Sequence, residues 1–224
     1  MSGTVLILGG TREAAALAET LTRTHPRSRV ITALAGRTRE PRPLAGETRI
    51  GGFGGAEGLA AYLRAERVTR LIDATHPYAH RISANAEAAA AMTGIELEKR
   101  IRPPWRRQPG DTWIDVGSEA EAARAIPAGA RVFLALGRQH LAPFARRADV
   151  HFVVRMIDPP PAPLPLPRHD LVVGRPGTTA AGEVALLRAH RIDRLVSRNS
   201  GGTGAYAKIA AARTLQMPVI MIGR

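Results

Sequence analysis

Residues 4–14 read TVLILGGTREA, and this stretch decides the fold. Its first five residues are apolar or β-branched, which predicts a strand, and the glycine pair that follows predicts a tight turn. Alanine and leucine then recur at helical spacing as far as Thr22, so we expect a helix after the turn. In this setting, backbone N–H groups and the helix dipole can hold a pyrophosphate. The candidate cofactor-binding residues are Gly9, Gly10, Thr11, Arg12 and Glu13.

The rest of the first half continues the alternation of strand and helix. Strands that alternate with helices imply right-handed crossovers and a parallel sheet. The first half therefore predicts a doubly wound, nucleotide-binding unit. We expect, in order, a strand Val30–Ala35 closed by Gly36, a glycine-rich loop Arg49–Gly58, a helix Leu59–Arg67, a strand Leu71–Ala74 and an alanine-rich helix that begins at Pro77 and ends near Met92.

Prolines and a glycine between residues 102 and 111 can continue neither a helix nor a central strand. We therefore predict two domains, residues 1–104 and 105–224. The fold class that we predict is α/β, with two Rossmann-like lobes, each on a parallel sheet, and the active site in the cleft between them. In the second half we expect strands Val132–Leu136, Phe152–Arg155, Leu171–Gly174, Leu195–Ser197 and Val219–Ile222, and helices Ala180–His190 and Ala205–Leu215. The proline-rich stretch Asp158–Pro167 is expected to be a stiff extended connection or a surface loop.

The composition limits the function classes. The chain has no cysteine, which excludes disulfides, thiolate metal sites and a cysteine nucleophile. Its formal charge is +13, and of 32 basic residues only Lys99 and Lys208 are lysine. Because the arginines are scattered and only 4% of residues are aromatic, a polycarboxylate or a dinucleotide phosphate suits this charge better than nucleic acid. We expect no membrane span and no signal peptide, and therefore a cytoplasmic location.

A second cofactor signal lies at the end of the second predicted strand. There, an acidic residue holds the ribose of NAD in dinucleotide folds, whereas an arginine accommodates the extra phosphate of NADP. Because the sequence has Arg37 at this place, between Gly36 and Thr38, we expect NADPH and assign these three residues to it. The alternatives are a solvated Arg37 and, since the first turn lacks the G-x-G-x-x-G spacing, a purely structural glycine turn.

Thr75, His76, Pro77 and Tyr78 follow the third strand of the first half, where ligands of parallel sheets bind. His76 and His80 are spaced as i and i+4, a spacing that can hold a metal on a helix. No third ligand is evident nearby, so we expect no metal and assign residues 75–78 to the cofactor.

Residues 197–204 read SRNSGGTG and precede the helix that carries Lys208. So many polar groups in a glycine-rich turn are costly unless a ligand uses them, although a capped helix with an exposed lysine is the alternative. The same run of strand, polar loop and alanine-rich helix occurs at residues 71–77, a weak internal echo. We assign Ser197 to the cofactor, Ser200 and Lys208 to catalysis, and Arg198, Asn199, Ser200, Gly201, Gly202 and Lys208 to the substrate.

These three stretches together resemble the precorrin-6A reductase family, which includes the cobalt-precorrin-6A reductases. The similarity rests on LILGGTRE at residues 6–13, DATHPYA at 73–79 and SRNSGG at 197–202 followed by Lys208, in that order. It implies NADPH-dependent reduction of a double bond of precorrin-6A, with a hydride and a proton delivered to adjacent ring carbons, to give precorrin-6B in cobalamin biosynthesis.

The resemblance also implies partners and residue roles. The substrate is a polycarboxylate tetrapyrrole, and neighbouring pathway enzymes are possible transient partners. Gly10 to Glu13 would face the pyrophosphate or ribose, Arg37 and Thr38 the 2′-phosphate, and residues 75–78 the nicotinamide. Ser200 would lie near the reacting carbons, and solvent is the other possible proton source. Two alternatives stay open: an NADPH-dependent reductase of another anionic small molecule, and a nucleotide-binding module without turnover.

Overall fold

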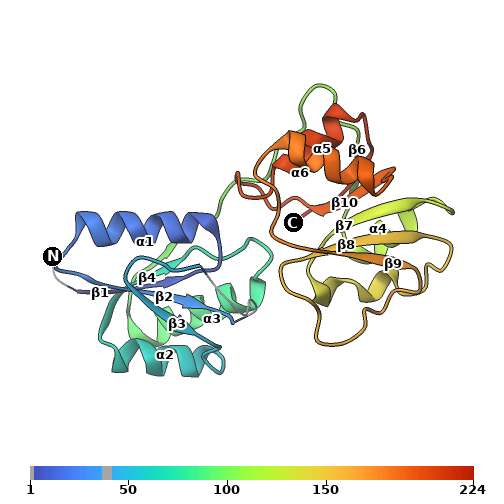
Figure 1. The fold of residues 1–224 in the computed structure, drawn as a ribbon. Helices are drawn as coiled ribbons and strands as arrows, with labels where there is room; N and C mark the ends of the chain where they lie inside the picture. The colour runs from blue at the N-terminus through green and yellow to red at the C-terminus, as the bar shows by residue number, and fades with distance from the viewer. Residues whose placement is uncertain (1–2, 37–41) are drawn as a thin grey trace. The chain divides into compact units, whose positions relative to one another are not determined.

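The computed structural model of the chain describes residues 3–36 and 42–224 (Figure 1). The chain divides into two compact units, residues 1–102 and 103–224. Within the described ranges, no helix is long and apolar enough to cross a membrane.

Unit 1 is built on a five-stranded sheet in which all neighbouring strands are parallel. The strand order is β3-β2-β1-β4-β5, so the direction in which strands are added reverses at β1. In sheets of this kind, ligands bind beyond the carboxyl ends of the two strands at the reversal, here β1 and β4. The strands are β1 Thr4–Leu8, β2 Arg29–Leu34, β3 Glu47–Ile50, β4 Val68–Asp73 and β5 Leu97–Lys99.

Helices cover both faces of this sheet (Figure 1). On one face, α1 (Arg12–Thr24) packs Ala14, Ala18 and Leu21 against alternate residues of β1 and β2. On the other face, α2 (Ala56–Ala65) and α3 (His80–Thr93) bury their leucines and alanines. The central strands β1, β2 and β4 are therefore largely apolar on both sides, as is usual for a parallel sheet covered on both faces.

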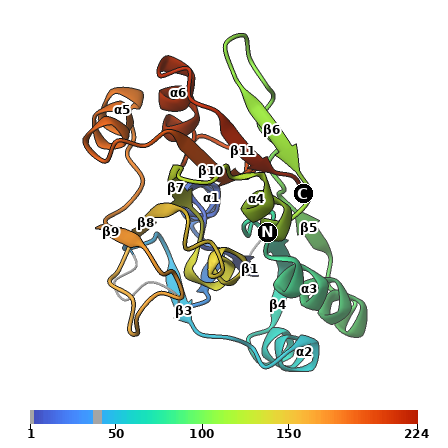
Figure 2. The ribbon, with the colours of Figure 1, turned by 90° about the vertical axis from the view of Figure 1, so that its right-hand side faces the viewer.

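Unit 2 has a six-stranded sheet in the order β6-β11-β10-β7-β8-β9, again with parallel neighbours throughout. Helices α5 and α6 cover one face, and α4 with two short 3₁₀ turns covers the other (Figure 2). The strands are β6 Trp113–Val116, β7 Arg131–Ala135, β8 His151–Met156, β9 His169–Val173, β10 Arg194–Arg198 and β11 Val219–Ile222. The helices are α4 Glu119–Ala125, η1 Arg138–His140, η2 Ala142–Phe144, α5 Ala180–Ala189 and α6 Ala207–Thr214.

The two sheets share one topology. In unit 2, β9-β8-β7-β10-β11 follows the same order as β3-β2-β1-β4-β5 in unit 1, with β6 added at the edge. The strand order therefore reverses at β7, beside β10. The echo between residues 71–77 and 195–201 is confirmed in this sense, because β4 and β10 hold equivalent places in their sheets.

The predicted α/β class with two parallel sheets is confirmed, but β3, β5, β6, α4 and the two 3₁₀ turns were not predicted from the sequence. The three strands lie at sheet edges and have only three or four residues, which leaves little alternation to detect. Helix α4 has only seven residues, but its capping box was readable: the Ser118 hydroxyl accepts from Glu121 N, and Glu121 Oε2 accepts from Gly117 N.

Several predicted boundaries were wrong; the strand predicted to begin at Leu71, for example, begins at Val68. The stretch 49–58 is not a single loop, because it contains the end of β3 and the first turn of α2. The helix expected to begin at Pro77 begins at His80, after a turn in which Ala79 N donates to His76 O at 2.7 Å. His76 and His80 therefore do not lie one turn apart on a helix.

The proline-rich connection 158–167 has no regular element, as predicted, yet it is not merely a surface loop. Leu164 and Leu166 alternate with its prolines and are buried in the core of unit 2, beside Val154. Because proline restricts the backbone, these leucines reach the core at a reduced loss of conformational entropy.

We predict that Leu166→Ala lowers the free energy of unfolding of unit 2 by about 2–5 kcal/mol, because a stiff backbone closes poorly over the cavity left behind. The control is Leu171→Ala on β9, whose side chain is exposed, with an expected loss below about 1 kcal/mol. Urea unfolding followed by tryptophan fluorescence measures both, since Trp105 and Trp113 both lie in unit 2. Equal losses for the two variants would contradict the packing role of the connection.

Candidate functional site

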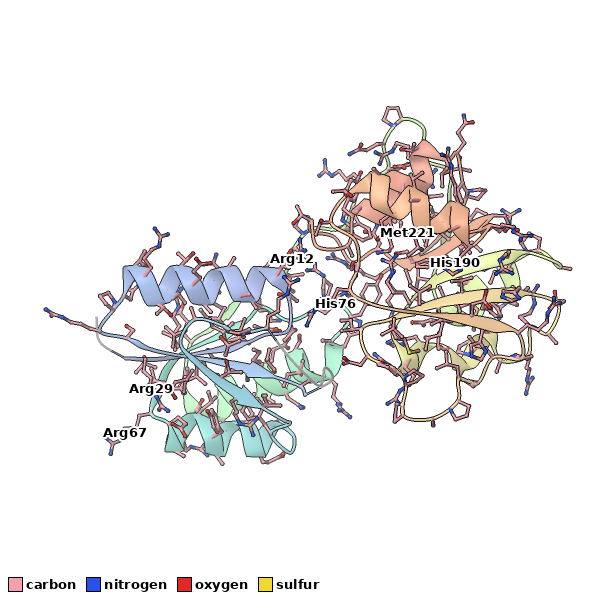
Figure 3. All side chains as sticks on the ribbon, viewed as in Figure 1. Arg12, Arg29, Arg67, His76, His190 and Met221 are labelled. Atoms are coloured by element: carbon pink, nitrogen blue, oxygen red, sulfur yellow. The ribbon has the colours of Figure 1, made fainter. Side chains whose placement is uncertain are left out.

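The candidate cofactor site of unit 1 lies at the carboxyl ends of β1 and β4. Arg12 and His76 lie at this end of the sheet, whereas Arg29 and Arg67 lie at the opposite end (Figure 3). Leu8 pairs with Asp73 in the parallel register, so the loops 9–11 and 74–79 leave the sheet side by side. The sequence-predicted residues Gly9 to Glu13 and Thr75 to Tyr78 are thereby brought together.

Gly9 and Gly10, the two glycines of the first loop, have different structural roles. A Cβ at Gly9 would come within 2.7 Å of Thr32 Cγ2, so this glycine lets β1 pack closely against β2. Gly10 has φ +100° and open space where a Cβ would lie. A backbone of this kind leaves room for a ligand phosphate to approach.

Thr11 joins the two loops. Its hydroxyl accepts from Ala14 N at 3.0 Å, which caps α1, and donates to Ala74 O at 2.8 Å. The cap leaves the other N–H groups of the first turn available, and these carry the positive end of the helix dipole. The hydrogen bond to Ala74 fixes the start of α1 relative to the end of β4.

Asp73, the last residue of β4, orders the loop 74–79 through side-chain hydrogen bonds. Its side chain is buried, and Oδ1 accepts from Thr75 N at 3.1 Å and from Thr75 Oγ1 at 2.6 Å. Such an Asx turn holds the backbone directly after the strand. His76 Nδ1 accepts from Tyr78 N at 3.3 Å, and the two rings lie 5.7 Å apart. The loop therefore presents an ordered imidazole and phenol next to α1.

The residues that follow β2, Gly36 to Thr38, were assigned to the cofactor near its 2′-phosphate. Gly36 follows β2 with φ +70° and lies against Ile50 and Gly51 at the end of β3. Arg37 and Thr38, assigned to the 2′-phosphate, lie outside the described residues. Glu13 is bound by Arg102 at 2.6 Å.

The glycine-rich turn 51–55 is a feature of this edge that was not assigned to the site from sequence. Arg49 donates to Gly51 O and Gly52 O, and its guanidinium lies 4.0 Å from the centre of the Phe53 ring. No atom lies within 4 Å of where a Cβ at Gly51, Gly52 or Gly54 would be, so backbone is exposed beside Gly36. The sequence feature that could have identified the turn 51–55 as part of the site is its position directly after a strand, β3.

In unit 2, the loop 199–204, which follows β10, binds Trp105 by hydrogen bonds. The Asn199 side chain accepts from Trp105 N at 2.7 Å and donates to Trp105 O at 3.0 Å, while the indole N–H donates to Gly202 O at 2.7 Å. Gly201, with φ +66°, fits where a Cβ would come within 2.0 Å of Pro103 O. Several polar groups of this loop are therefore used in hydrogen bonds within the chain, with Trp105.

Lys208 is buried, which differs from the exposed lysine weighed as the structural alternative. Its Nζ donates to Ala205 O at 3.0 Å and lies 5.0 Å from the centre of the Trp105 ring. Ser197 and Ser200 are also buried, and Ser197 Oγ donates to Arg198 O at 3.2 Å. Lys208 therefore lies against Trp105, and the two serines are buried polar residues of the neighbouring stretch 197–200.

Arg198 ends β10 and is held by a carboxylate. It donates to Glu119 Oε1 through both Nε, at 3.0 Å, and Nη2, and its Nη2 also donates to His140 Nδ1 at 2.5 Å. Burial of Glu119 opposes its ionisation, but the hydrogen bonds from Arg198 and from its own backbone N–H outweigh burial and lower the pKa of the carboxyl. Arg198 is therefore fixed in direction before any ligand arrives.

Further basic residues follow other strands of this sheet. Because the carboxyl ends of parallel strands meet at one edge, these side chains belong to the same edge as Arg198. They were not assigned to the site from sequence, although Arg175 comes directly after a predicted strand and the others follow one within four residues. They are Arg138 and His140 after β7, Arg175 after β9 and Arg224 after β11.

Nothing in the described part of the chain forms a group of three or more His, Cys, Asp or Glu residues that could hold a metal ion. The chemistry of both edges is instead that of anion recognition: exposed backbone N–H groups in unit 1 and guanidinium groups in unit 2.

Comparison with known proteins gives a consistent answer. Residues 4–224 match the family model described as Precorrin-6x reductase CbiJ/CobK. A precorrin-6A reductase of Rhodobacter capsulatus is 48% identical over 221 residues, which cover 98% of this chain and 87% of that protein. One from Mycobacterium tuberculosis is 43% identical over 222 residues, covering 98% and 88%.

A solved structure described as CobK precorrin-6A reductase superimposes with a TM-score of 0.94 at 47% identity, covering 99% of this chain and 88% of that chain. The match therefore extends to the whole fold. On both sequence and structure, this chain belongs to the precorrin-6x reductase CbiJ/CobK family.

Proposed function

We propose that this chain reduces precorrin-6A to precorrin-6B with NADPH, in cobalamin biosynthesis. The family match over residues 4–224 carries the proposal, because it includes every stretch on which the candidate sites are built. Unit 1 binds the cofactor, and the basic edge of unit 2 binds carboxylates of the tetrapyrrole.

The carboxyl edge of sheet 1 fits a dinucleotide. Gly10 leaves space for the pyrophosphate, and the capped start of α1 offers N–H groups to it. Gly36 and the turn 51–55 lie beside the end of β2, where the adenosine ribose of a dinucleotide is held in this fold. Arg37, by its place in the sequence, binds the 2′-phosphate. Thr75, His76, Pro77 and Tyr78 flank the nicotinamide.

When bound, NADPH supplies a hydride to one ring carbon, and the adjacent carbon takes a proton. The residues of the chain orient the reactants and exclude water. Arg198, fixed by Glu119, and Arg175 on its loop bind substrate carboxylates. The contacts of Asn199, Gly202 and Lys208 with Trp105 hold the loop that carries Ser200. We assign Ser200 to a place near the reacting carbons, as one source of the proton.

The experiment that tests this function is cofactor oxidation by the purified protein with precorrin-6A, followed by the loss of dihydronicotinamide absorbance, with NADH as the control cofactor. We expect oxidation with NADPH and formation of a product two hydrogens heavier by mass spectrometry. Binding of NADPH without oxidation would remove the substrate assignment, and absence of binding would remove the cofactor assignment.

We predict that Arg37→Ala reduces the preference for NADPH over NADH by about tenfold or more, because a charge-assisted bond to the 2′-phosphate is worth about 1.5–3 kcal/mol. The ratio of kcat/KM for the two cofactors measures it. Turnover with NADH should be nearly unchanged in this variant. An unchanged ratio would show that another residue holds the 2′-phosphate.

We predict that Arg175→Gln raises the KM for precorrin-6A roughly tenfold, since one charged hydrogen bond to a carboxylate is lost. The matched control is Arg168→Gln, which removes the same charge from an exposed side chain at the opposite end of β9. Its KM should change less than about twofold, because a general loss of positive field is screened. Equal changes in both variants would indicate long-range attraction and no contact at Arg175.

A further inference from the structure

A buried ion pair joins the core of unit 2 to the carboxyl edge of its sheet. Arg155 Nη1 and Nη2, from β8, donate to Glu183 Oε1 and Oε2, from α5, at 2.8 and 2.9 Å. The two side chains are only 7% and 3% exposed, and the guanidinium lies 4.9 Å from the centre of the Phe133 ring. This bidentate pair is more deeply buried than the other ion pairs of the described chain.

Stability alone does not account for such a pair. Desolvation of two charges offsets most of their attraction, so apolar residues of similar size are often equally stable at such positions. The carboxylate has a further contact, because Glu183 Oε1 also accepts from Gly177 N at 2.7 Å. That contact reaches outside the core, to the loop between β9 and α5.

The loop 174–179 fits closely on the carboxylate. A Cβ at Gly177 would come within 2.5 Å of Glu183 Oε1, so only glycine allows this approach without a shift. Thr179 ends the loop, and its hydroxyl accepts from Gly182 N at 3.2 Å to cap α5. One end of the loop is therefore held by the helix cap, and its middle is held by Glu183.

We propose that Arg155 and Glu183 are positioning residues for substrate binding, which set the loop 174–179 through Gly177 and so direct Arg175. This rests on the proposed function, in which Arg175 binds a carboxylate of the tetrapyrrole. Arg155 keeps the carboxylate in place with two hydrogen bonds, and the carboxylate holds the loop backbone. The arginine that meets the substrate is then ordered in advance, which lowers the entropy lost on binding.

The test separates positioning from stability with three variants. Arg155→Met combined with Glu183→Met removes both charges and leaves no buried charge alone, so unfolding in urea should stay near that of the wild type. Gly177→Ala keeps the ion pair but pushes the loop away from it. The control, Arg213→Met with Asp111→Met, removes another part-buried ion pair of unit 2, before β6.

Two measurements are made on each folded variant. Hydrogen exchange of the backbone amides of residues 174–179, followed by mass spectrometry, needs no substrate. We expect about tenfold faster exchange in both test variants and none of this change in the control. With precorrin-6A we expect KM to rise about tenfold, with kcat and the Kd for NADPH changed less than about twofold.

Wild-type exchange of the loop in both test variants would overturn the proposal, because the pair would then be merely structural. Faster exchange with an unchanged KM would overturn the link from the loop to the substrate. If the wild-type protein does not reduce precorrin-6A at all, the proposed function fails, while the exchange experiment still decides whether the pair positions the loop.

Discussion

The parallel pairing of β1 with β4, and of β7 with β10, is the constraint on which both candidate sites depend. At each of these places the next connections run to opposite sides, so the loops diverge and leave polar backbone groups exposed above the sheet. Hydrogen bonds across the gap then order the edge. In unit 1, Thr11, which follows β1, donates to Ala74 O after β4; in unit 2, Arg198 Nη2 at the end of β10 donates to Nδ1 of His140, which follows β7, at 2.5 Å. The strand order thus determines where each candidate site lies, and the side chains at that place adapt it to a particular ligand.

Local pattern was enough to predict the central strands and the class of fold. The run at residues 4–8 and the strand at 219–222 appear as expected, because strands buried on both faces are continuously apolar. The edges were harder to read, since Glu47–Ile50 has charged residues and a single paired neighbour. The start of α3 was also misplaced: proline is common at the first position of a helix, and here Pro77 lies in a preceding turn.

The candidate site was predictable wherever a residue acts through its own backbone or its place after a strand. Gly10 and Thr11 belong to this class, because a turn and a cap involve only residues near in sequence. Asn199 and Lys208 do not, since their contacts with Trp105 join residues about a hundred positions apart. Glu183 lies within a predicted helix, and only its ion pair with Arg155 on β8 reveals it as a buried carboxylate.

The two proposed sites offer different groups to an anion, in a chain whose net charge is +13. Unit 1 offers backbone N–H groups, which are fixed by the fold and need no counter-charge. Unit 2 offers guanidinium groups on long side chains, which repel one another and lose rotamer freedom when they bind. Glu119 on Arg198, and Glu183 beneath the loop of Arg175, reduce both penalties: each carboxylate neutralises some positive charge and fixes a direction. If the proposed substrate binds at this edge, these acidic residues strengthen selectivity, because the substrate must match cations whose positions are already set.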